Sequence, residues 1–444
     1  MKTIRTAVLL LLLFGLAQAQ QITLWTTEEQ PERLEIQNRI ASDFEAQTGI
    51  GVEVVPVTES AMGERATAAF AAGELPDVIF HPLSRTIGWA QEGILDTFAA
   101  TDVVLDLGED TFVEGSLDLV AFQGGYAAVP HSGWTQLLLY RADLFEEHGL
   151  EPPTSYEAIR EAIDVLHDPP EMYGFVAATD PNEDYMMQVF EHIALANGVR
   201  LVDEEGNVTL DSEAMVETLE FYKDLVEASP PGNLYWQQSR ELYFAGDAAM
   251  IIWSPFILDE LAGLRDEVPV VFNAETEGAS LADRTGIVSQ ISGPSNPEGA
   301  GWADMRYYGI TIDADLEAAK QFVEYSMSEG YVDTLSIAPE GTFPLRRGPD
   351  PGSREFVEQW SQLDVGVSSR APLAEVFEEE VINDIVAGLE NADRWGYSQG
   401  QGALVSSLYG TRVISELVRE FIDGERSAQE TAQLMQQEVA ALQQ

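Results

Sequence analysis

Tryptophan residues stand at turns and strand ends in several places along this 444-residue chain. These residues are Trp25, Trp134, Trp236, Trp253 and Trp302. An indole ring can cover the apolar C–H face of a sugar, while carboxylates, amides and arginines bond to the rim of hydroxyls. Hydrogen bonds to charged groups are about twice as strong as neutral ones, so a few of them would fix the orientation of such a guest. The residue types therefore indicate noncovalent binding of a neutral, polyhydroxylated solute, although each tryptophan taken singly could equally be core.

Two of these rings have polar neighbours in the sequence. Trp236 stands just before a predicted helix and is followed by Gln237, so a ring and an amide could act together. Trp253 ends an apolar run and is followed by Ser254. In contrast, the tryptophans that lie on helical patterns are expected to pack in the core or on the surface: Trp89, Trp360 and Trp395.

Signatures of catalysis are missing from the sequence. There is no His-Glu-x-x-His, no Gly-x-Ser-x-Gly, no phosphate-binding Gly-Lys-Ser/Thr loop and no cysteine. The five histidines are scattered singly, and the acidic turn 180–185 lacks the alternation of a calcium loop. With 76 acidic residues, some carboxylate pair will always suggest glycoside hydrolysis, so a secreted glycosidase is only the alternative. We expect no enzyme activity, metal or cofactor.

The charge balance is strongly acidic, with 23 basic against 76 acidic residues and a formal net charge of -53. A field of this sign repels nucleic acid and anionic membranes and disfavours anionic ligands. It would suit a cationic solute as an alternative guest. Self-repulsion at this level destabilises a compact fold unless counterions screen it, so we expect a salt-adapted protein with a halophile-like surface.

The first 19 residues have the pattern of a signal peptide. Lys2 and Arg5 precede an apolar run that ends at Leu16, and Ala17-Gln18-Ala19 fits a small-x-small cleavage site. The run is about half of the roughly 20 residues that span a bilayer. We expect export to a periplasm with cleavage after Ala19 and, because cysteine is absent, no thiol-linked lipid.

Strands and helices alternate in the first part of the mature chain, which predicts an α/β fold with a parallel sheet. The expected elements are a strand at 22–26, a helix at 30–49, a strand at 52–57, a helix near 64–72 and a strand at 77–80. Such sheets bind ligands at the carboxyl ends of their strands. Here those ends carry Trp25, Thr27, Glu28 and, in the next strand, His81 and Ser84.

The second part is more helical. Extended runs are expected at 126–130 and 135–140, joined by 131–134, and Thr154 is expected to cap the helix after the Pro-Pro pair. Later strands are predicted at 267–272, 287–294 and 305–312. Tyr307 and Tyr308 alternate on the last of these, so at most one can face a cleft, and Tyr308 is the candidate.

Five stretches in order resemble the extracellular solute-binding proteins of ABC importers, in the group around maltodextrin-binding protein. They are FEAQTGIGVEVV, AAGELPDVIF, YRADLFEEHGLEPPTSYEAI, YFAGDAAMIIW and PEGTFPLRRG. The resemblance implies two α/β lobes, hinge segments and a central ligand cleft that closes around the solute. It also implies a carbohydrate ligand, or another polyol-like solute, and a transmembrane permease as partner, with a monomeric receptor.

The resemblance further divides the chain. Residues 20–128 and 303–338 would form the N-terminal lobe, and residues 129–302 and 339–444 the C-terminal lobe. The chain would cross between the lobes at 128–134, near 306–312 and near 339–348.

Several contacts with the solute are implied by the resemblance alone. Trp253 matches a position that often stacks on the solute, and Trp25 and Glu28 lie in a loop that often contacts it. His81 stands where relatives place an acidic or polar residue, so a structural role is nearly as plausible. Arg346 matches a position that often reaches the cleft, although Arg347 could equally do so.

Overall fold

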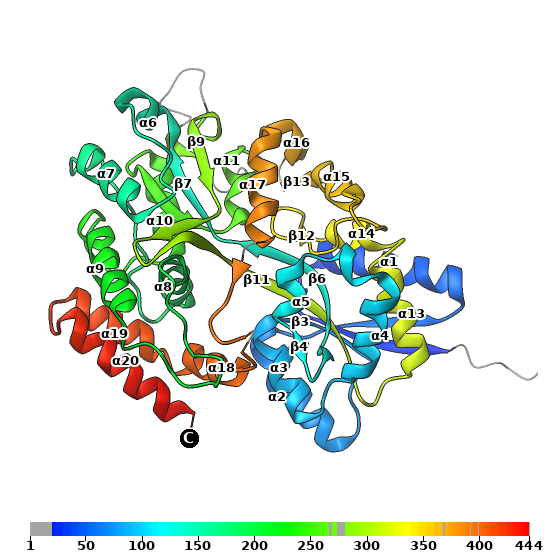
Figure 1. Cartoon of the computed structure of the whole chain (residues 1–444). Coiled ribbons are helices and arrows are strands. Elements are labelled where there is room, and N and C mark those ends of the chain that lie inside the picture. The colour runs from blue at the N-terminus through cyan, green and yellow to red at the C-terminus, as the bar shows by residue number, and fades with distance from the viewer. Residues whose placement is uncertain are drawn as a thin grey trace, which may run out of the picture.

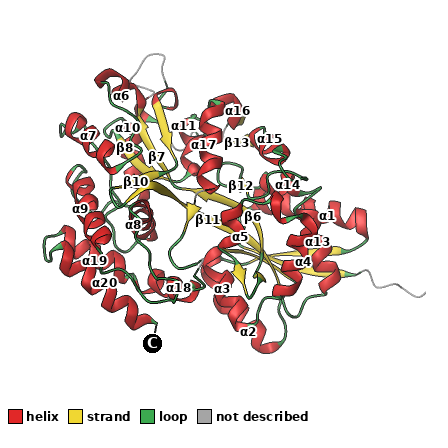
Figure 2. Cartoon of the chain, in the orientation of Figure 1, coloured by secondary structure: helices red, strands yellow, loops and turns green. Residues whose placement is uncertain are grey.

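The two-lobed α/β fold predicted from the sequence is present in the computed structural model, in which helices surround two sheets (Figures 1 and 2). The structure describes residues 20–265, 269–272, 280–366, 369–390, 392–397 and 399–443.

The N-terminal lobe is built on the larger sheet, in the strand order β12-β6-β11-β3-β1-β2. Its strands are β1 (Gln21–Thr26), β2 (Gly51–Pro56), β3 (Val78–Pro82), β6 (Val129–Thr135), β11 (Asn296–Ile310) and β12 (Phe343–Pro344). β1 pairs in parallel with β2 and β3, whereas β11 runs antiparallel to β3 and β6. The parallel strands β1 and β3 therefore end together, at Thr26 and Pro82, next to Trp25 and His81, on the side that faces the other lobe.

Helices and a small hairpin complete this lobe. They are α1 (Pro31–Thr48), α2 (Glu59–Ala72), α3 (Leu83–Glu92), α4 (Thr97–Leu107), η1 (Glu109–Thr111), α5 (Glu114–Asp118), β4 (Ala121–Phe122), β5 (Gly125–Tyr126), α13 (Leu316–Ser326), α14 (Tyr331–Leu335) and α15 (Glu355–Ser361). Glycine ends α1, α2 and α3 in the left-handed conformation, as at Gly49 with φ 79°. The stops of α1 and α2, at Gly49 and Gly73, agree with the predicted helix ends.

The C-terminal lobe contains a three-stranded sheet in the order β8-β7-β9. Its strands are β7 (Leu137–Arg141), β8 (Met250–Trp253) and β9 (Thr285–Val288), and β10 (Ile291–Gly293) and β15 (Ala392–Asp393) pair with β11. The first helices are α6 (Ala142–His148), α7 (Tyr156–Leu166), α8 (Asp184–Ala196), α9 (Glu213–Glu227), α10 (Trp236–Ala245), η2 (Pro255–Ile257), α11 (Leu258–Leu261) and η3 (Ala282–Arg284). The remaining elements are β13 (Asp364–Val365), β14 (Ala371–Pro372), α16 (Leu373–Val376), α17 (Glu379–Glu390), α18 (Gly402–Thr411), α19 (Val413–Ile422) and α20 (Ala428–Leu442).

Two neighbouring strands, β6 and β11, join the lobes. β6 leads directly into β7, and β11 is hydrogen-bonded to β6 and β3 at one end and to β10 and β15 at the other. The segment 131–134, predicted as a connection between two extended runs, is itself part of strand β6. The crossing strands are visible between the two groups of helices in Figure 2.

The structure places residues 343–361 against the N-terminal lobe, whereas the sequence assigned them to the C-terminal lobe. β12 pairs with β6, and the Phe356 ring on α15 lies 5.1 Å from the Tyr331 ring on α14. The chain reaches the C-terminal lobe only after α15, where the Ser369 N–H bonds to the Leu264 carbonyl. The contact between the aromatic rings of α14 and α15 holds residues 343–361 against the N-terminal lobe.

Two local predictions differ from the structure. The N-cap of α7 is Ser155, whose side chain accepts from the Ala158 N–H, and not Thr154. Of the predicted strand 267–272, residues 267–268 lie outside the described residues, and 269–272 form no strand. Ser155 competes with Thr154 as the cap, and residues 271–272 are helical, so this part of the apolar run is not extended.

Candidate functional site

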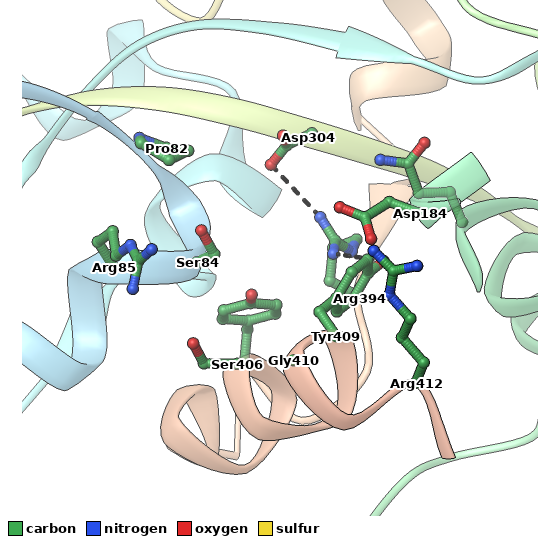
Figure 3. Close-up of a pocket in the computed structure, with 12 residues that line it drawn as sticks. Pro82, Ser84, Arg85, Asp184, Asp304, Arg394, Ser406, Tyr409, Gly410 and Arg412 are labelled. Carbon is green, nitrogen blue, oxygen red and sulfur yellow. Dashed lines mark hydrogen bonds and ion pairs between the residues drawn. The ribbon is translucent and has the colours of Figure 1, made fainter. Parts of the chain in front are cut away.

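A polar cavity of about 630 Å³ lies between the lobes (Figure 3). The N-terminal lobe contributes Pro82, at the end of β3, and Ser84 and Arg85 on α3. Asp304 comes from the crossing strand β11. The rest of the lining belongs to the C-terminal lobe: Asp184, Gln188, Arg394, Tyr397, Ser406, Tyr409, Gly410 and Arg412. Both lobes thus supply polar groups to one shared space.

A buried arginine anchors one wall of the cavity. Arg394 Nε lies 3.0 Å from Glu191 Oε1, and Arg394 Nη1 lies 3.4 Å from Asp304 Oδ1. The Tyr409 hydroxyl donates to Glu191 Oε2 over 2.9 Å, and the guanidinium lies 4.4 Å from the centre of the Trp302 ring. Burial and the Glu191 carboxylate raise the pKa of Tyr409, which stays protonated. This network fixes the wall before any solute arrives.

A second pair of opposite charges, Asp184 and Arg412, lies at the start of α8. Burial raises the pKa of Asp184, and the nearby positive charge of Arg412 opposes that shift. Figure 3 shows the two side chains reaching toward the same side of the cavity, with Arg85 on the far side. Such a site offers charged donors, charged acceptors and hydroxyls together, which matches a guest that both donates and accepts hydrogen bonds.

The predicted tryptophans of the C-terminal lobe form a stacked pair. The Trp236 and Trp253 rings have centroids 5.4 Å apart at an interplanar angle of 11°, and both are half-buried. The Tyr185 ring meets Trp253 edge-on at 4.9 Å, and Tyr185 follows the cavity residue Asp184. The pair therefore lies close to the cavity without lining it.

The polar neighbours of this pair differ in exposure. Gln237 is half-buried and accepts a hydrogen bond from the Tyr235 hydroxyl. Ser254 is buried, and its hydroxyl has no partner among the described residues.

The loop after β1, which was predicted to contact the solute, makes contacts within the N-terminal lobe. Trp25 is buried, and the Arg65 guanidinium lies 4.3 Å from the centre of its ring. Thr27 and Glu28 are half-buried, and Glu28 Oε2 accepts from Arg33 Nη1 over 3.0 Å. Glu28 and Thr27 therefore remain at the edge of the lobe, whereas the Trp25 ring is covered.

His81 and Tyr308 lie inside the N-terminal lobe. The His81 ring is buried between Trp89 and Tyr307, and burial lowers the pKa of His81 from 6.5 to about 4. Its Nε2 has no hydrogen-bond partner among the described residues. Tyr308 packs in the core against Phe80, and Tyr307 is fully buried as well, so neither of the adjacent tyrosines reaches the cavity.

Trp134 and Arg346 are held by packing and by hydrogen bonds. The Trp134 ring lies 5.1 Å from that of Trp302, since strand pairing sets Trp134 opposite Asp304. The Arg346 guanidinium donates to Thr111 Oγ1 and to the backbone carbonyls of Met327, Leu107 and Pro349. Arg346 is thus a buried cross-link within the N-terminal lobe. Its guanidinium donors are used in these bonds, so the side chain does not extend into the cleft as expected.

Most of the residues that line the cavity were not predicted from the sequence. Ser84 was noted as a strand end and Asp184 as part of an acidic turn, but the stretch 394–412 gave no signal of its own. Trp89, Trp360 and Trp395, expected to pack in the core or on the surface, are buried in the core. Among the described residues, no cluster of three or more His, Asp or Glu side chains could hold a metal ion.

Comparison with known proteins shows to which family this architecture belongs. The family model for bacterial extracellular solute-binding proteins matches residues 28–333. The chain belongs to this family. The family comprises solute-binding proteins and not enzymes.

Individual relatives agree with the family. The chain is 25% identical over 393 residues to a protein of Escherichia coli (strain K12) that bears the name putative ABC transporter periplasmic-binding protein YcjN, and the match covers 86% of each chain. The solved GacH receptor of Streptomyces glaucescens has a TM-score of 0.69 at 19% identity, covering 96% of this chain and 98% of that one. The cyclic alpha-maltosyl-1,6-maltose binding protein of Arthrobacter globiformis has a TM-score of 0.73 at 15% identity, covering 95% and 98%. These structural likenesses show that the two-lobed fold is shared.

Proposed function

We propose that this solute-binding protein captures a sugar or short oligosaccharide between its lobes and delivers it to the permease of an ABC importer. One observation carries the proposal: both lobes line the same cavity with polar groups, Ser84 and Arg85 from one side and charged groups and hydroxyls such as Asp184, Arg394 and Tyr409 from the other. Only differential affinity for the closed state can drive closure, and a cavity shared by both lobes supplies such contacts.

The relatives support a carbohydrate as the guest. The GacH receptor is known in complex with acarbose, and the Arthrobacter protein is named for a cyclic maltosyl-maltose. Three arginines line the cavity of this chain, Arg85, Arg394 and Arg412. They argue against the cationic solute that the acidic composition left open, because like charges repel.

Export and partners belong to the same proposal. The mature protein would begin after Ala19, reside in a periplasm and act as a monomer that docks on its permease. None of the helices in the described ranges combines the length and apolar character that crossing a membrane requires.

Titration calorimetry at 2 M NaCl with maltose, maltotriose and a cyclodextrin tests the proposal, with mass spectrometry of the sugar afterwards. We expect saturable binding near 1 µM, about -8 kcal/mol, and unchanged sugar. Arg85→Gln should weaken binding, because Arg85 lines the cavity, whereas Arg39→Gln, an exposed residue on α1, should not. Release of shorter products would instead support the glycosidase.

A further inference from the structure

A row of alternating acidic and basic side chains connects the two lobes between α1 and α11. On α1, Arg33 Nη1 lies 3.0 Å from Glu28 Oε2, and Arg33 Nη2 lies 3.8 Å from Glu340 Oε1. From the other side, Arg265 Nη2 lies 3.6 Å from the same Glu340 oxygen. Arg265 Nε also bonds to Asp259 Oδ2 over 2.6 Å. One carboxylate oxygen of Glu340 is therefore shared by two arginines. We call Glu28, Arg33, Glu340, Arg265 and Asp259 the ionic latch.

The Arg265–Glu340 pair crosses from one lobe to the other. Glu340 lies in a segment bound to the N-terminal lobe, where Thr342 Oγ1 donates to the Leu335 carbonyl and Trp360 Nε1 to the Pro339 carbonyl. Arg265 follows α11 in the C-terminal lobe. Next to the pair, a Cβ added at Gly341 would lie 2.0 Å from the Phe256 ring of η2, so the segments touch closely.

The latch is largely shielded from water. The side chains of Glu340 and Asp259 are 7% and 0% exposed, and those of Arg33 and Arg265 are 23% and 26% exposed. Burial raises the pKa of Glu340, and the two arginines oppose this shift. Removal of one partner from a buried pair leaves an uncompensated charge, which costs far more than loss of an exposed pair.

The row continues toward the tryptophan pair. Arg240 Nη1 lies 2.6 Å from Glu260 Oε1, next to Asp259 in the chain, and the Arg240 guanidinium lies 5.0 Å from the Trp236 ring centre. Glu28 stands at the other end, in the loop after β1. The two ends are thus candidate solute contacts from opposite lobes.

We propose that Glu340 is a positioning residue for solute capture. Its ion pair with Arg265 holds the lobes together and so sets the separation of Glu28 from the Trp236 ring. The holding role stands whatever the solute is, whereas the effect on affinity rests on the proposed function. Because salt screens partly exposed charges, the pair should weaken as ionic strength rises.

Interlobe distances in the solute-free protein test the proposal directly. The chain has no cysteine, so Ser42→Cys on α1 and Asp164→Cys on α7 provide unique spin-label sites for double electron–electron resonance. With Glu340→Gln, we expect the fraction of long distances at 0.1 M NaCl to rise roughly three- to tenfold. In the wild type, the same fraction should rise gradually up to 2 M NaCl.

Matched variants complete the experiment. Arg265→Gln should open the lobes as Glu340→Gln does, and the double variant should open them no further than either single change, since both remove one interaction. Arg265→Gln also serves if Glu340→Gln fails to fold. Glu35→Gln, an exposed residue on α1, removes the same charge and should leave the distances unchanged. Distances and salt response equal to wild type in both latch variants would overturn the proposal. Opening without any change in sugar affinity would retain the latch and remove its role in capture.

Discussion

The rings of Trp236 and Trp253 lie nearly parallel in the C-terminal lobe, 5.4 Å apart at 11°. Trp253 is further held by the edge of Tyr185, whose hydroxyl donates to the Ile252 carbonyl over 2.7 Å. The pair is half-buried, and Tyr185 links it to the cavity residue Asp184, so we propose that it offers a preformed aromatic surface to the solute.

We therefore expect Trp253→Ala to raise the Kd for sugar at least about tenfold, or ~1.4 kcal/mol, because the stacked surface is lost. Calorimetry measures the Kd, and circular dichroism checks the fold. Phe70→Ala removes a ring that is 39% exposed on α2 and should leave the Kd unchanged. Equal affinities for Trp253→Ala and wild type would exclude the stacking role.

Arg394→Gln should lower the free energy of unfolding by about 3–5 kcal/mol, because it leaves Glu191 buried with less charge compensation. Urea denaturation gives this quantity. Arg426→Gln breaks the exposed pair with Glu420 and should leave the free energy of unfolding nearly unchanged. A similar small cost for both variants would show that the Arg394 network contributes little to stability.

His81 should make stability fall as the pH drops. Its pKa is about 4 in the folded protein against 6.5 when exposed, so between these values the unfolded state binds the extra proton and is favoured. From pH 7 to pH 5, the wild type should lose about 2 kcal/mol more than His81→Gln. Urea midpoints at both pH values measure the difference. His148→Gln, exposed on α6, should behave as the wild type does, and an unchanged slope in His81→Gln would contradict the assignment.

The melting temperature should rise between 0.1 M and 2 M NaCl. With a formal net charge of -53, self-repulsion opposes folding, and the screening length falls from about 10 Å at 0.1 M to about 3 Å at 1 M. Differential scanning calorimetry measures the shift. Sucrose at matched osmolality controls for solvent exclusion, and a flat or falling melting temperature in NaCl would rule out salt adaptation.

Elements with a strong local pattern were predictable from the sequence. The strand 77–80 is a short apolar run, and the helix 30–49 carries apolar spacing and a glycine stop; both are present, as β3 and α1. β11 begins at Asn296, well before the predicted start at 305. Pro297, Gly299 and Gly301 favour a loop, so the prediction missed this part of the strand. Its pairing partners, which are remote in the chain, make this stretch a strand.

The candidate site depended more heavily on long-range contacts. Arg394 is held at the cavity by its bond to Glu191, which lies over 200 residues away in the chain. No short sequence motif predicts this contact. Trp134 looked available at a turn, but cross-strand pairing lays it against Trp302. Residue type indicated the kind of guest, whereas tertiary pairing decided which groups surround the cavity.

The central position of β11 also constrains how the protein is made. In the larger sheet, β11 separates β6 from β3, so these two strands cannot be joined until the ribosome has synthesised residue 310 of 444. Most of the polypeptide must therefore emerge before the first lobe acquires its native strand order.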